Sequence, residues 1–220
     1  MTDDLDTPSR RVLDPVDRIS EVLFGLFMVL TFTGTISVVD SGRQQVRDMM
    51  IAAIGCNIAW GFVDGVMYVL RNLVERSHKL RLVRAVRAAA QPEQAYRLIG
   101  RELGPLAGAL GTAELERLRR WAVEQAPQAE PSVALTRRDL EGAVAVFLLV
   151  FLSTFPVVVP FVFIQDPALA KRVSAGVAIV MLFACGVAWG RHAGQNAWRF
   201  GLVMVLLGLA VEAVVIALGG

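Results

Sequence analysis

Long apolar stretches alternate with polar segments along the chain. Five of the apolar stretches are long enough to cross a bilayer: 19–39, 49–70, 142–164, 173–189 and 200–218. A hydrocarbon core about 30 Å thick needs about 20 apolar residues in helical form. Backbone polar groups in lipid must pair within the segment, which favours helices over strands. We therefore predict an all-α integral membrane protein with five transmembrane helices.

The second and third apolar stretches are separated by a long polar segment, which we interpret as an insert. Its pattern predicts helices near 75–90, 92–103 and 112–125, the last starting at Thr112 with Glu114 and Glu116 in its first turn. The predicted organisation is a tail at 1–18, a transmembrane hairpin at 19–71, a helical cytoplasmic insert at 72–141 and three further spans at 142–220.

Composition agrees with the pattern, since 55% of the 220 residues are apolar and the mean hydropathy is +0.54. The placement of positive charge suggests the orientation. With the N-terminus inside, 18 Lys and Arg residues lie inside, and four lie outside: Arg43, Arg47, Lys171 and Arg172. Without the long insert the counts are five and four, and the insert residues next to the spans decide the orientation: Arg71, Arg76, Arg137 and Arg138. We expect a bacterial inner-membrane protein with a cytoplasmic N-terminus.

The second span contains the most informative polar residues. Asn57 and Asp64 are seven positions apart and lie on one helix face, with Met67 beside them. A carboxylate inside a membrane is costly and often functional. Carboxylate, amide and thioether groups together could bind a divalent metal, and the thioether would favour a transition metal. The alternative is that Asn57 and Asp64 bond neighbouring helices and that Met67 only packs.

Four other residues are candidates for binding ions or protons. Glu21 lies near the inner mouth of the first span and could gather cations, or could sit at the level of the lipid headgroups. Glu212 in the last span is a proton candidate, unless it only lies near the outer interface. Glu75 and His78 have the i, i+3 spacing of metal sites in helical bundles, although a solvated helix face gives the same pattern.

An enzyme is not indicated, because we find no nucleophile–base pair and no phosphate-binding loop, and the histidines are His78 and His192. We expect no permanently bound cofactor and no nucleic-acid partner. Cys56 and Cys185 lie in apolar stretches and are interpreted as buried thiols.

Three segments resemble the vacuolar iron transporter family of divalent-metal transporters. They are Glu21-Val-Leu-Phe-Gly-Leu-Phe-Met-Val-Leu-Thr, Phe155-Pro-Val-Val-Val-Pro-Phe, and the last helix from Gly201 with Met204-Val-Leu-Leu-Gly and the terminal Leu-Gly-Gly. The resemblance implies five spans, a cytoplasmic metal-binding insert between the second and third, and proton-coupled transport of Fe²⁺ or Mn²⁺.

The chain differs from the family at several positions. Met28 stands where the family's first helix carries an Asp-Gly pair, and an Asp64-Gly65 pair lies on the second span. Tyr68 fits the family's second helix, but the residues before it read Asp64-Gly-Val-Met67. The insert contains no methionine.

Two functions follow as hypotheses. In the first, a homodimer exports Fe²⁺ or Mn²⁺ from the cytoplasm in exchange for protons. Asp64, Met67 and Asn57 supply ligands in this hypothesis, Met28 and Glu21 lie along the path, and Glu75 with His78 collects metal below it. In the second, the chain is a membrane anchor whose arginine-rich insert binds a partner or anionic lipid, to which each basic residue contributes about 1 kcal/mol.

Overall fold

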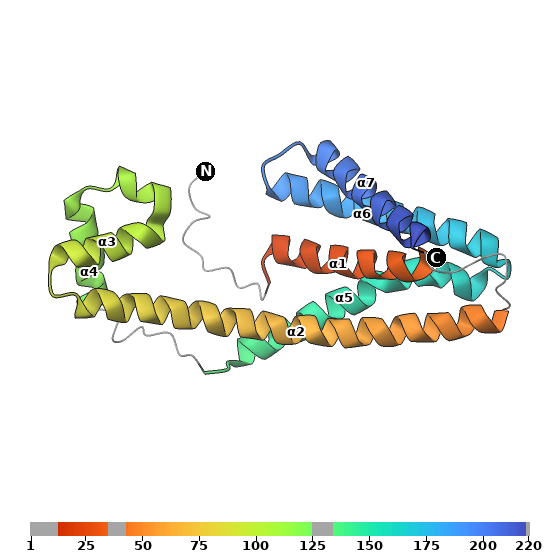
Figure 1. Cartoon of the computed structure of the whole chain (residues 1–220), viewed down its shortest axis with the longest axis horizontal. Coiled ribbons are helices and arrows are strands. Elements are labelled where there is room, and N and C mark those ends of the chain that lie inside the picture. The colour runs from red at the N-terminus through yellow and green to blue at the C-terminus, as the bar shows by residue number, and fades with distance from the viewer. Residues whose placement is uncertain (1–12, 35–42, 125–133, 219–220) are drawn as a thin grey trace. The chain divides into compact units, whose positions relative to one another are not determined.

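The structure, a computed structural model, describes residues 13–34, 43–124 and 134–218 (Figure 1). These residues form helices and connecting turns and contain no strand, so the predicted all-α fold is confirmed. The helices run as follows: α1 Pro15–Gly34, α2 Arg43–Ala88, α3 Pro92–Leu103, the 3₁₀ helix η1 Gly104–Ala109, α4 Thr112–Glu124, α5 Arg137–Phe163, α6 Pro167–His192 and α7 Ala197–Ala217.

The chain divides into two compact units. The bundle unit comprises the described residues up to Tyr68 and from Arg137 onward, and the insert unit comprises Val69–Thr136. The sequence pattern placed these boundaries three to five residues later, at 71/72 and 141/142. Helix α2 passes through the first boundary without a break, because no glycine or proline interrupts residues 66–88.

Four described helices are long and apolar enough to cross a membrane. They are α2 from Met50 onward, α5, α6 and α7. Helix α1 is 20 residues long and carries Asp17, Arg18 and Glu21 near its start, while the predicted end of the first span, 35–39, lies outside the described residues. The predicted count of five spans therefore remains a prediction.

The core of the bundle unit lies between α1, α5 and α6. Four residues of α1 are buried there together with two residues each from α5 and α6: Leu23, Leu26, Val29, Leu30, Val157, Val158, Ala178 and Leu182. The hydroxyl of Ser174 on α6 is completely buried and donates to the carbonyl oxygen of Val157 at 2.6 Å. Helix α5 contains Pro156 and Pro160, yet it continues to Phe163.

Glycines bring the helices of the bundle unit into close contact. A β-carbon at Gly186 of α6 would stand 2.7 Å from the carbonyl oxygen of Phe200 on α7. On α2, a β-carbon at Gly61 would meet the Phe147 ring of α5 at 3.1 Å. Small residues at such positions allow backbones to approach closely in membranes.

The insert unit is a small helical layer with its own core. Val86 of α2, Ala95 of α3 and Ala122 of α4 are buried against one another. Pro92 begins α3, where its missing N–H costs no hydrogen bond. Helices α3 and α4 begin and end within one residue of the predicted positions.

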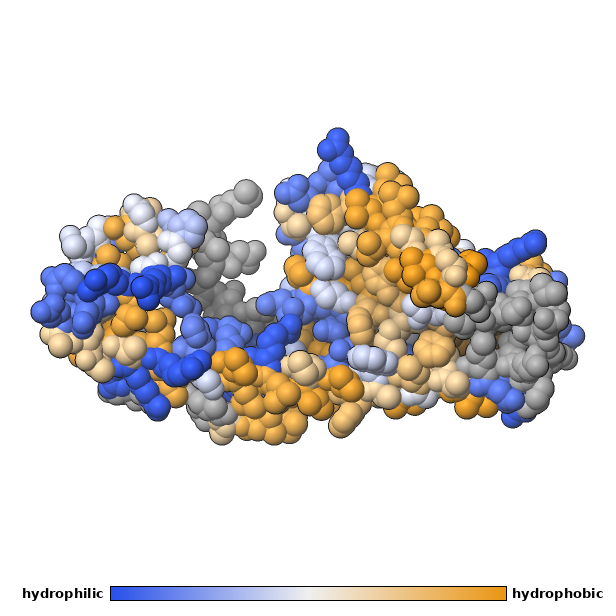
Figure 2. Space-filling view, in the orientation of Figure 1, coloured by the Kyte–Doolittle hydropathy of each residue, from blue (hydrophilic) through white to orange (hydrophobic). Residues whose placement is uncertain are grey.

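The two units have different surfaces. Figure 2 shows apolar side chains gathered over α7 and over part of α2 in the bundle unit, and hydrophilic side chains over much of the insert unit. The exposed apolar residues of α7 are Trp198, Leu202, Val203, Leu206, Leu207, Leu209, Val214 and Ile216. An apolar surface of this extent fits a lipid environment or a partner chain.

Candidate ion site between α1, α2 and α5

Asn57 of α2 is held against α5 and is 4% exposed. Its amide nitrogen Nδ2 donates to Thr154 Oγ1 at 2.8 Å and, less closely, to the carbonyl oxygen of Phe151 at 3.4 Å. The oxygen Oδ1 is buried and has no hydrogen-bond partner among the described residues. A buried amide oxygen without a partner is unusual and calls for an explanation, such as a water or an ion.

A small cavity adjoins Asn57. Its volume is about 10 Å³, and it is lined by Met28, Val29 and Phe32 of α1, Ala53, Ile54 and Asn57 of α2, and Thr154 and Val158 of α5. A cavity of roughly 10–15 Å³ holds one water, so it also has room for one small cation. The structure thus brings together two residues that the sequence singled out separately, Met28 and Asn57.

Asp64 lies two helical turns beyond Asn57 on the same face of α2. Its carboxylate is half-buried, and its Oδ2 is buried without a hydrogen-bond partner among the described residues. Seven residues of helix correspond to about 10 Å along the axis, whereas metal–oxygen bonds are about 2.0–2.6 Å long. Asn57 and Asp64 therefore cannot bind the same ion at the same time.

Glu21 of α1 lies at about the same height along the bundle as Asp64 of α2. Helices α1 and α2 run in opposite directions (Figure 1), and the rings of Phe24 and Trp60 meet edge to face with centroids 6.0 Å apart. Glu21 precedes Met28 by seven residues, and Asp64 follows Asn57 by seven. The two carboxylates consequently share one level of the bundle, about 10 Å from the level of Met28 and Asn57.

Met67 lies apart from these residues. It is 56% exposed, and its side chain is outside the cavity lining. The predicted stripe on α2 therefore separates into Asn57 and Asp64, which have buried oxygens, and Met67, which faces outward.

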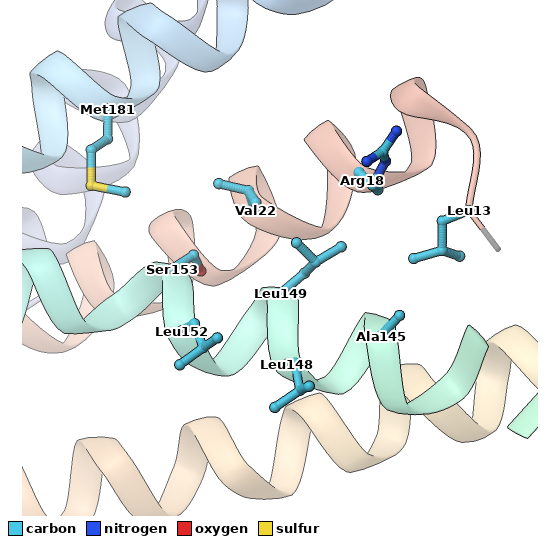
Figure 3. Close-up of a pocket in the computed structure, with 9 residues that line it drawn as sticks. All are labelled: Leu13, Arg18, Val22, Ala145, Leu148, Leu149, Leu152, Ser153 and Met181. Atoms are coloured by element: carbon cyan, nitrogen blue, oxygen red, sulfur yellow. The ribbon is translucent and has the colours of Figure 1, made fainter. Parts of the chain in front are cut away.

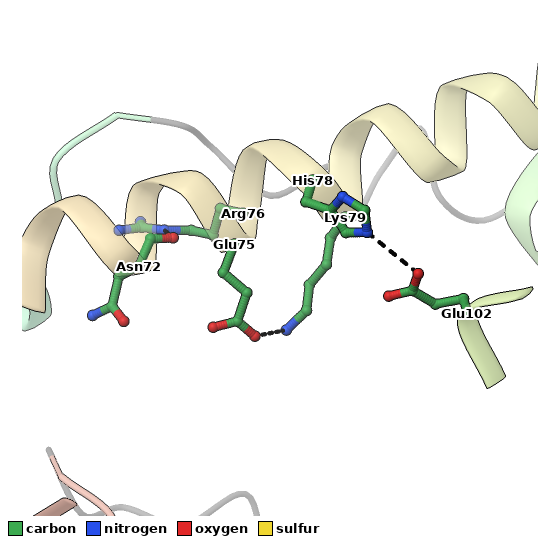
Figure 4. Close-up of polar contacts among 6 residues, drawn as sticks. All are labelled: Asn72, Glu75, Arg76, His78, Lys79 and Glu102. Carbon is green, nitrogen blue, oxygen red and sulfur yellow. Dashed lines mark hydrogen bonds and ion pairs between the residues drawn. The ribbon is translucent and has the colours of Figure 1, made fainter. Parts of the chain in front are cut away.

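Each residue of the predicted pair in the insert unit has a polar partner of its own. Glu75 accepts a hydrogen bond from Lys79 Nζ at 2.7 Å, and this contact lowers the pKa of Glu75. His78 Nε2 lies 3.3 Å from Glu102 Oε2, and both side chains are about half exposed (Figure 4). The described residues contain no group of three or more His, Cys, Asp or Glu side chains placed to bind a metal.

Another carboxylate of the insert unit is bound more tightly. Glu116 accepts two hydrogen bonds from Arg119, at 2.7 and 2.8 Å, and one from the Tyr96 hydroxyl at 2.9 Å. These donors lower the pKa of Glu116 to about 2. The contact joins α3 to α4.

Comparison with known proteins identifies the family. The family model that describes the VIT family matches residues 88–220. The chain belongs to the VIT family. This confirms the resemblance to the vacuolar iron transporters. The match covers the insert helices α3 and α4 and all of α5–α7, whereas Met28, Asn57 and Asp64 lie before its first residue. No curated protein matches the chain.

Glu212 of this VIT-family chain lies on α7 and is half-buried. It does not line the cavity beside Asn57. Its role in proton transfer remains a prediction.

A larger hollow of this VIT-family chain lies between α1 and α5 and is mainly apolar (Figure 3). Its volume is about 580 Å³, and it is lined by Leu13, Arg18, Val22, Ala145, Leu148, Leu149, Leu152, Ser153 and Met181. None of the predicted ion-binding residues lies in it. With Arg18 and Ser153 as its only polar lining residues, this hollow is a poor place to hold a cation.

Sequence reasoning did not identify Thr154 as part of the site. A hydroxyl in the middle of an apolar span usually bonds back to its own helix, and Thr154 Oγ1 does donate to the Phe151 carbonyl at 2.8 Å. Its second role, as acceptor for Asn57, depends on which helix packs against α5. No local pattern in the sequence carries that information.

Proposed function

We propose that this VIT-family chain transports a divalent transition-metal ion, Fe²⁺ or Mn²⁺, across the membrane. The observation that supports this most is the cavity lined by Met28 of α1 and Asn57 of α2, with Asn57 Oδ1 buried and unpartnered among the described residues. An amide oxygen suits hard divalent ions, and a thioether favours softer transition metals. Together they would bind Fe²⁺ or Mn²⁺ in preference to Mg²⁺ or Ca²⁺.

The carboxylate level formed by Glu21 and Asp64 supports a path for the ion. Carboxylates attract a cation strongly, while the neutral donors Met28 and Asn57 would hold it loosely. A transported ion must bind well enough to enter the path and weakly enough to leave it. We propose that the ion passes from Glu21 and Asp64 to Met28 and Asn57, with Met67 and Glu212 as further candidates for metal and proton binding.

We further propose export from the cytoplasm in exchange for protons, by a homodimer in a bacterial inner membrane with its N-terminus inside. The distribution of Lys and Arg supports this orientation. The exposed apolar residues of α2 and α7 leave surface for a second copy. Glu75 and His78 would collect metal on the cytoplasmic side. The transported ion is the cargo, and no permanently bound cofactor is proposed.

The test is transport by the purified full chain in proteoliposomes. Fe²⁺, Mn²⁺, Co²⁺, Zn²⁺, Mg²⁺ and Ca²⁺ are offered in turn, with a pH-sensitive dye inside the vesicles. We expect flux of Fe²⁺ and Mn²⁺ with an opposing pH change, and little flux of Mg²⁺ or Ca²⁺. Absence of flux for every ion would refute the proposed function.

A second candidate function is a membrane anchor whose insert unit binds a partner or anionic lipid. It is favoured by the composition of Val69–Thr136, which has 11 Lys or Arg residues against seven Glu. Glu75, Glu102 and Glu116 are each already bonded within the insert unit. This function would be preferred if the full chain carried no metal and bound anionic vesicles more tightly than neutral ones in a salt-sensitive manner.

A further inference from the structure

The hydrogen bonds around Thr154 determine which end of the Asn57 amide faces α5. The single hydroxyl proton of Thr154 is donated to the Phe151 carbonyl at 2.8 Å. Toward Asn57, the hydroxyl therefore presents a lone pair and can act only as an acceptor. The Phe151 carbonyl is also an acceptor. Two acceptors on α5 require a donor from α2, and Asn57 Nδ2 is that donor.

The opposite orientation of the amide is disfavoured by the same contacts. A flipped Asn57 would place Oδ1 against two oxygen lone pairs and would leave the NH₂ group at the cavity. Because the amide is planar, directing Nδ2 toward α5 turns Oδ1 away from Thr154 and Phe151. The side chain thus presents an oxygen, the atom that binds cations, and keeps away the NH₂ group, which would repel them.

We propose that Thr154 is a positioning residue for ion transport: its hydroxyl fixes the Asn57 amide with Oδ1 presented to the cavity shared with Met28. This inference rests on the proposed function, because it concerns how tightly the transported cation is held. Thr154 is 6% exposed, and its hydroxyl donates to a carbonyl oxygen of its own helix. The burial of this hydroxyl therefore does not require a hydrogen bond with Asn57.

Packing alone would explain Asn57 less well. An apolar residue of similar size at position 57 would fill the space without leaving a buried carbonyl oxygen unpaired. Leaving such an oxygen unpaired is unfavourable. The Asn57–Thr154 bond joins α2 to α5, which holds the two helices together, but that role leaves Oδ1 unpaired, whereas a cation in the cavity would satisfy it.

The decisive experiment removes the hydroxyl of Thr154 while keeping its shape. Thr154→Val and Thr154→Ser are compared in Mn²⁺ flux assays in proteoliposomes. For Thr154→Val we expect KM for Mn²⁺ to rise about tenfold with a smaller change in kcat, the size that follows from one weakened ion contact. Thr154→Ser keeps the hydroxyl and should stay within about twofold of the unmodified chain.

Ser153→Ala is the matched control. Ser153 is also 6% exposed and donates to its own helix, to Val150 O at 2.8 Å, but it faces Gly25 of α1 instead of Asn57. Its loss should leave KM unchanged. If Thr154→Val does not yield a monodisperse protein, Thr154→Ala is used in its place.

A double-mutant cycle separates positioning from general destabilisation. In an Asn57→Leu background, Thr154→Val should have almost no further effect on KM, because the amide that it positions is gone. Equal effects in both backgrounds, or equal KM values for Thr154→Val and Ser153→Ala, would overturn the inference while leaving the proposed function intact. Absence of Mn²⁺ flux in the unmodified chain would instead refute the proposed function and the inference with it.

Discussion

Met28 and Asn57 lie on different helices, 29 residues apart in the chain, and line the same buried cavity. One contributes a thioether and the other an amide, so neither donor carries a charge. A divalent ion between them would keep its full charge in a region of low dielectric constant, where charge is costly. The carboxylates of Glu21 and Asp64, about 10 Å away along the helices, would supply negative charge to balance it.

Removing the charge of Asp64 should therefore impair transport. We expect Asp64→Asn to lower Mn²⁺ flux at least about tenfold, the effect of losing a contact worth about 1.4 kcal/mol or more. The measurement is initial flux in proteoliposomes at equal protein density. Asp48→Asn is the control, because it makes the same change at an exposed position of the same helix and should have no effect. Equal flux for the unmodified chain and Asp64→Asn would show that the ion path lies elsewhere.

The thioether of Met28 should affect which metal is carried more than it affects stability. Met28→Leu conserves volume and should change the free energy of unfolding by less than about 1.5 kcal/mol. Loss of sulfur should reduce the preference for Fe²⁺ over Mg²⁺, measured as the ratio of their fluxes. Met204→Leu, on α7 against the apolar core, makes the same change away from the cavity. An unchanged ratio in Met28→Leu would exclude sulfur as a ligand.

Helix α6 offers a test of glycine packing within one element. A β-carbon at Gly186 would approach backbone atoms of α7 at 2.7 and 2.8 Å, whereas one at Gly176 would meet nothing within 4 Å. Gly186→Ala should destabilise the protein by roughly 1–3 kcal/mol. Gly176→Ala should be neutral or stabilise by up to about 1 kcal/mol, from helix propensity. Thermal unfolding in detergent compares the two, and similar melting temperatures would contradict the packing.

The contact between Glu116, Arg119 and Tyr96 predicts acid sensitivity of the insert unit. The pKa of Glu116 is lowered from 4.5 to about 2 by its hydrogen bonds with Arg119 and Tyr96. Its contribution to stability is therefore complete above pH 4.5 and is lost as the pH falls toward 2. Hydrogen exchange of α3 and α4 in the full chain should accelerate over this range.

Glu116→Gln should lose that protection already at neutral pH and should show a weaker pH dependence. Glu93→Gln removes another α3–α4 carboxylate, one that is exposed, and should behave like the unmodified chain. If the exchange rates of the unmodified chain and Glu116→Gln changed with pH in parallel, Glu116 would not be the titrating group.

Much of the helical architecture could be predicted from hydropathy alone. Periodicity and Pro92 located α3, and the apolar stretches located α5, α6 and α7. The ends of α2 were harder to predict, because a helix that leaves a membrane can continue in water without any change in its local pattern. The pattern gave an apolar span at 49–70 and a helix at 75–90 that continues from it, and the structure contains one helix of 46 residues that begins earlier, at Arg43.

The site was only partly predictable, and for a physical reason. Period 3.6 showed that Asn57 and Asp64 share a face, but it could not show that Thr154 and Met28 would meet that face. Such contacts depend on which helices pack together. In the same way, the spacing of Glu75 and His78 gave no sign that Lys79 and Glu102 would be their polar partners.

The glycine contacts of α2 also limit how this chain can vary. Gly61 and Gly65 lie against α5, as Asn57 does, so one stripe of the helix both packs and carries the amide that we propose binds the ion. Phe62 and Val66, on exposed faces, are not limited in this way. A saturation mutagenesis scan of α2 should therefore show tolerance that rises and falls with each helical turn. Substitutions at Gly61 would be rejected for their size and substitutions at Asn57 for their chemistry, although the two residues are neighbours on one surface.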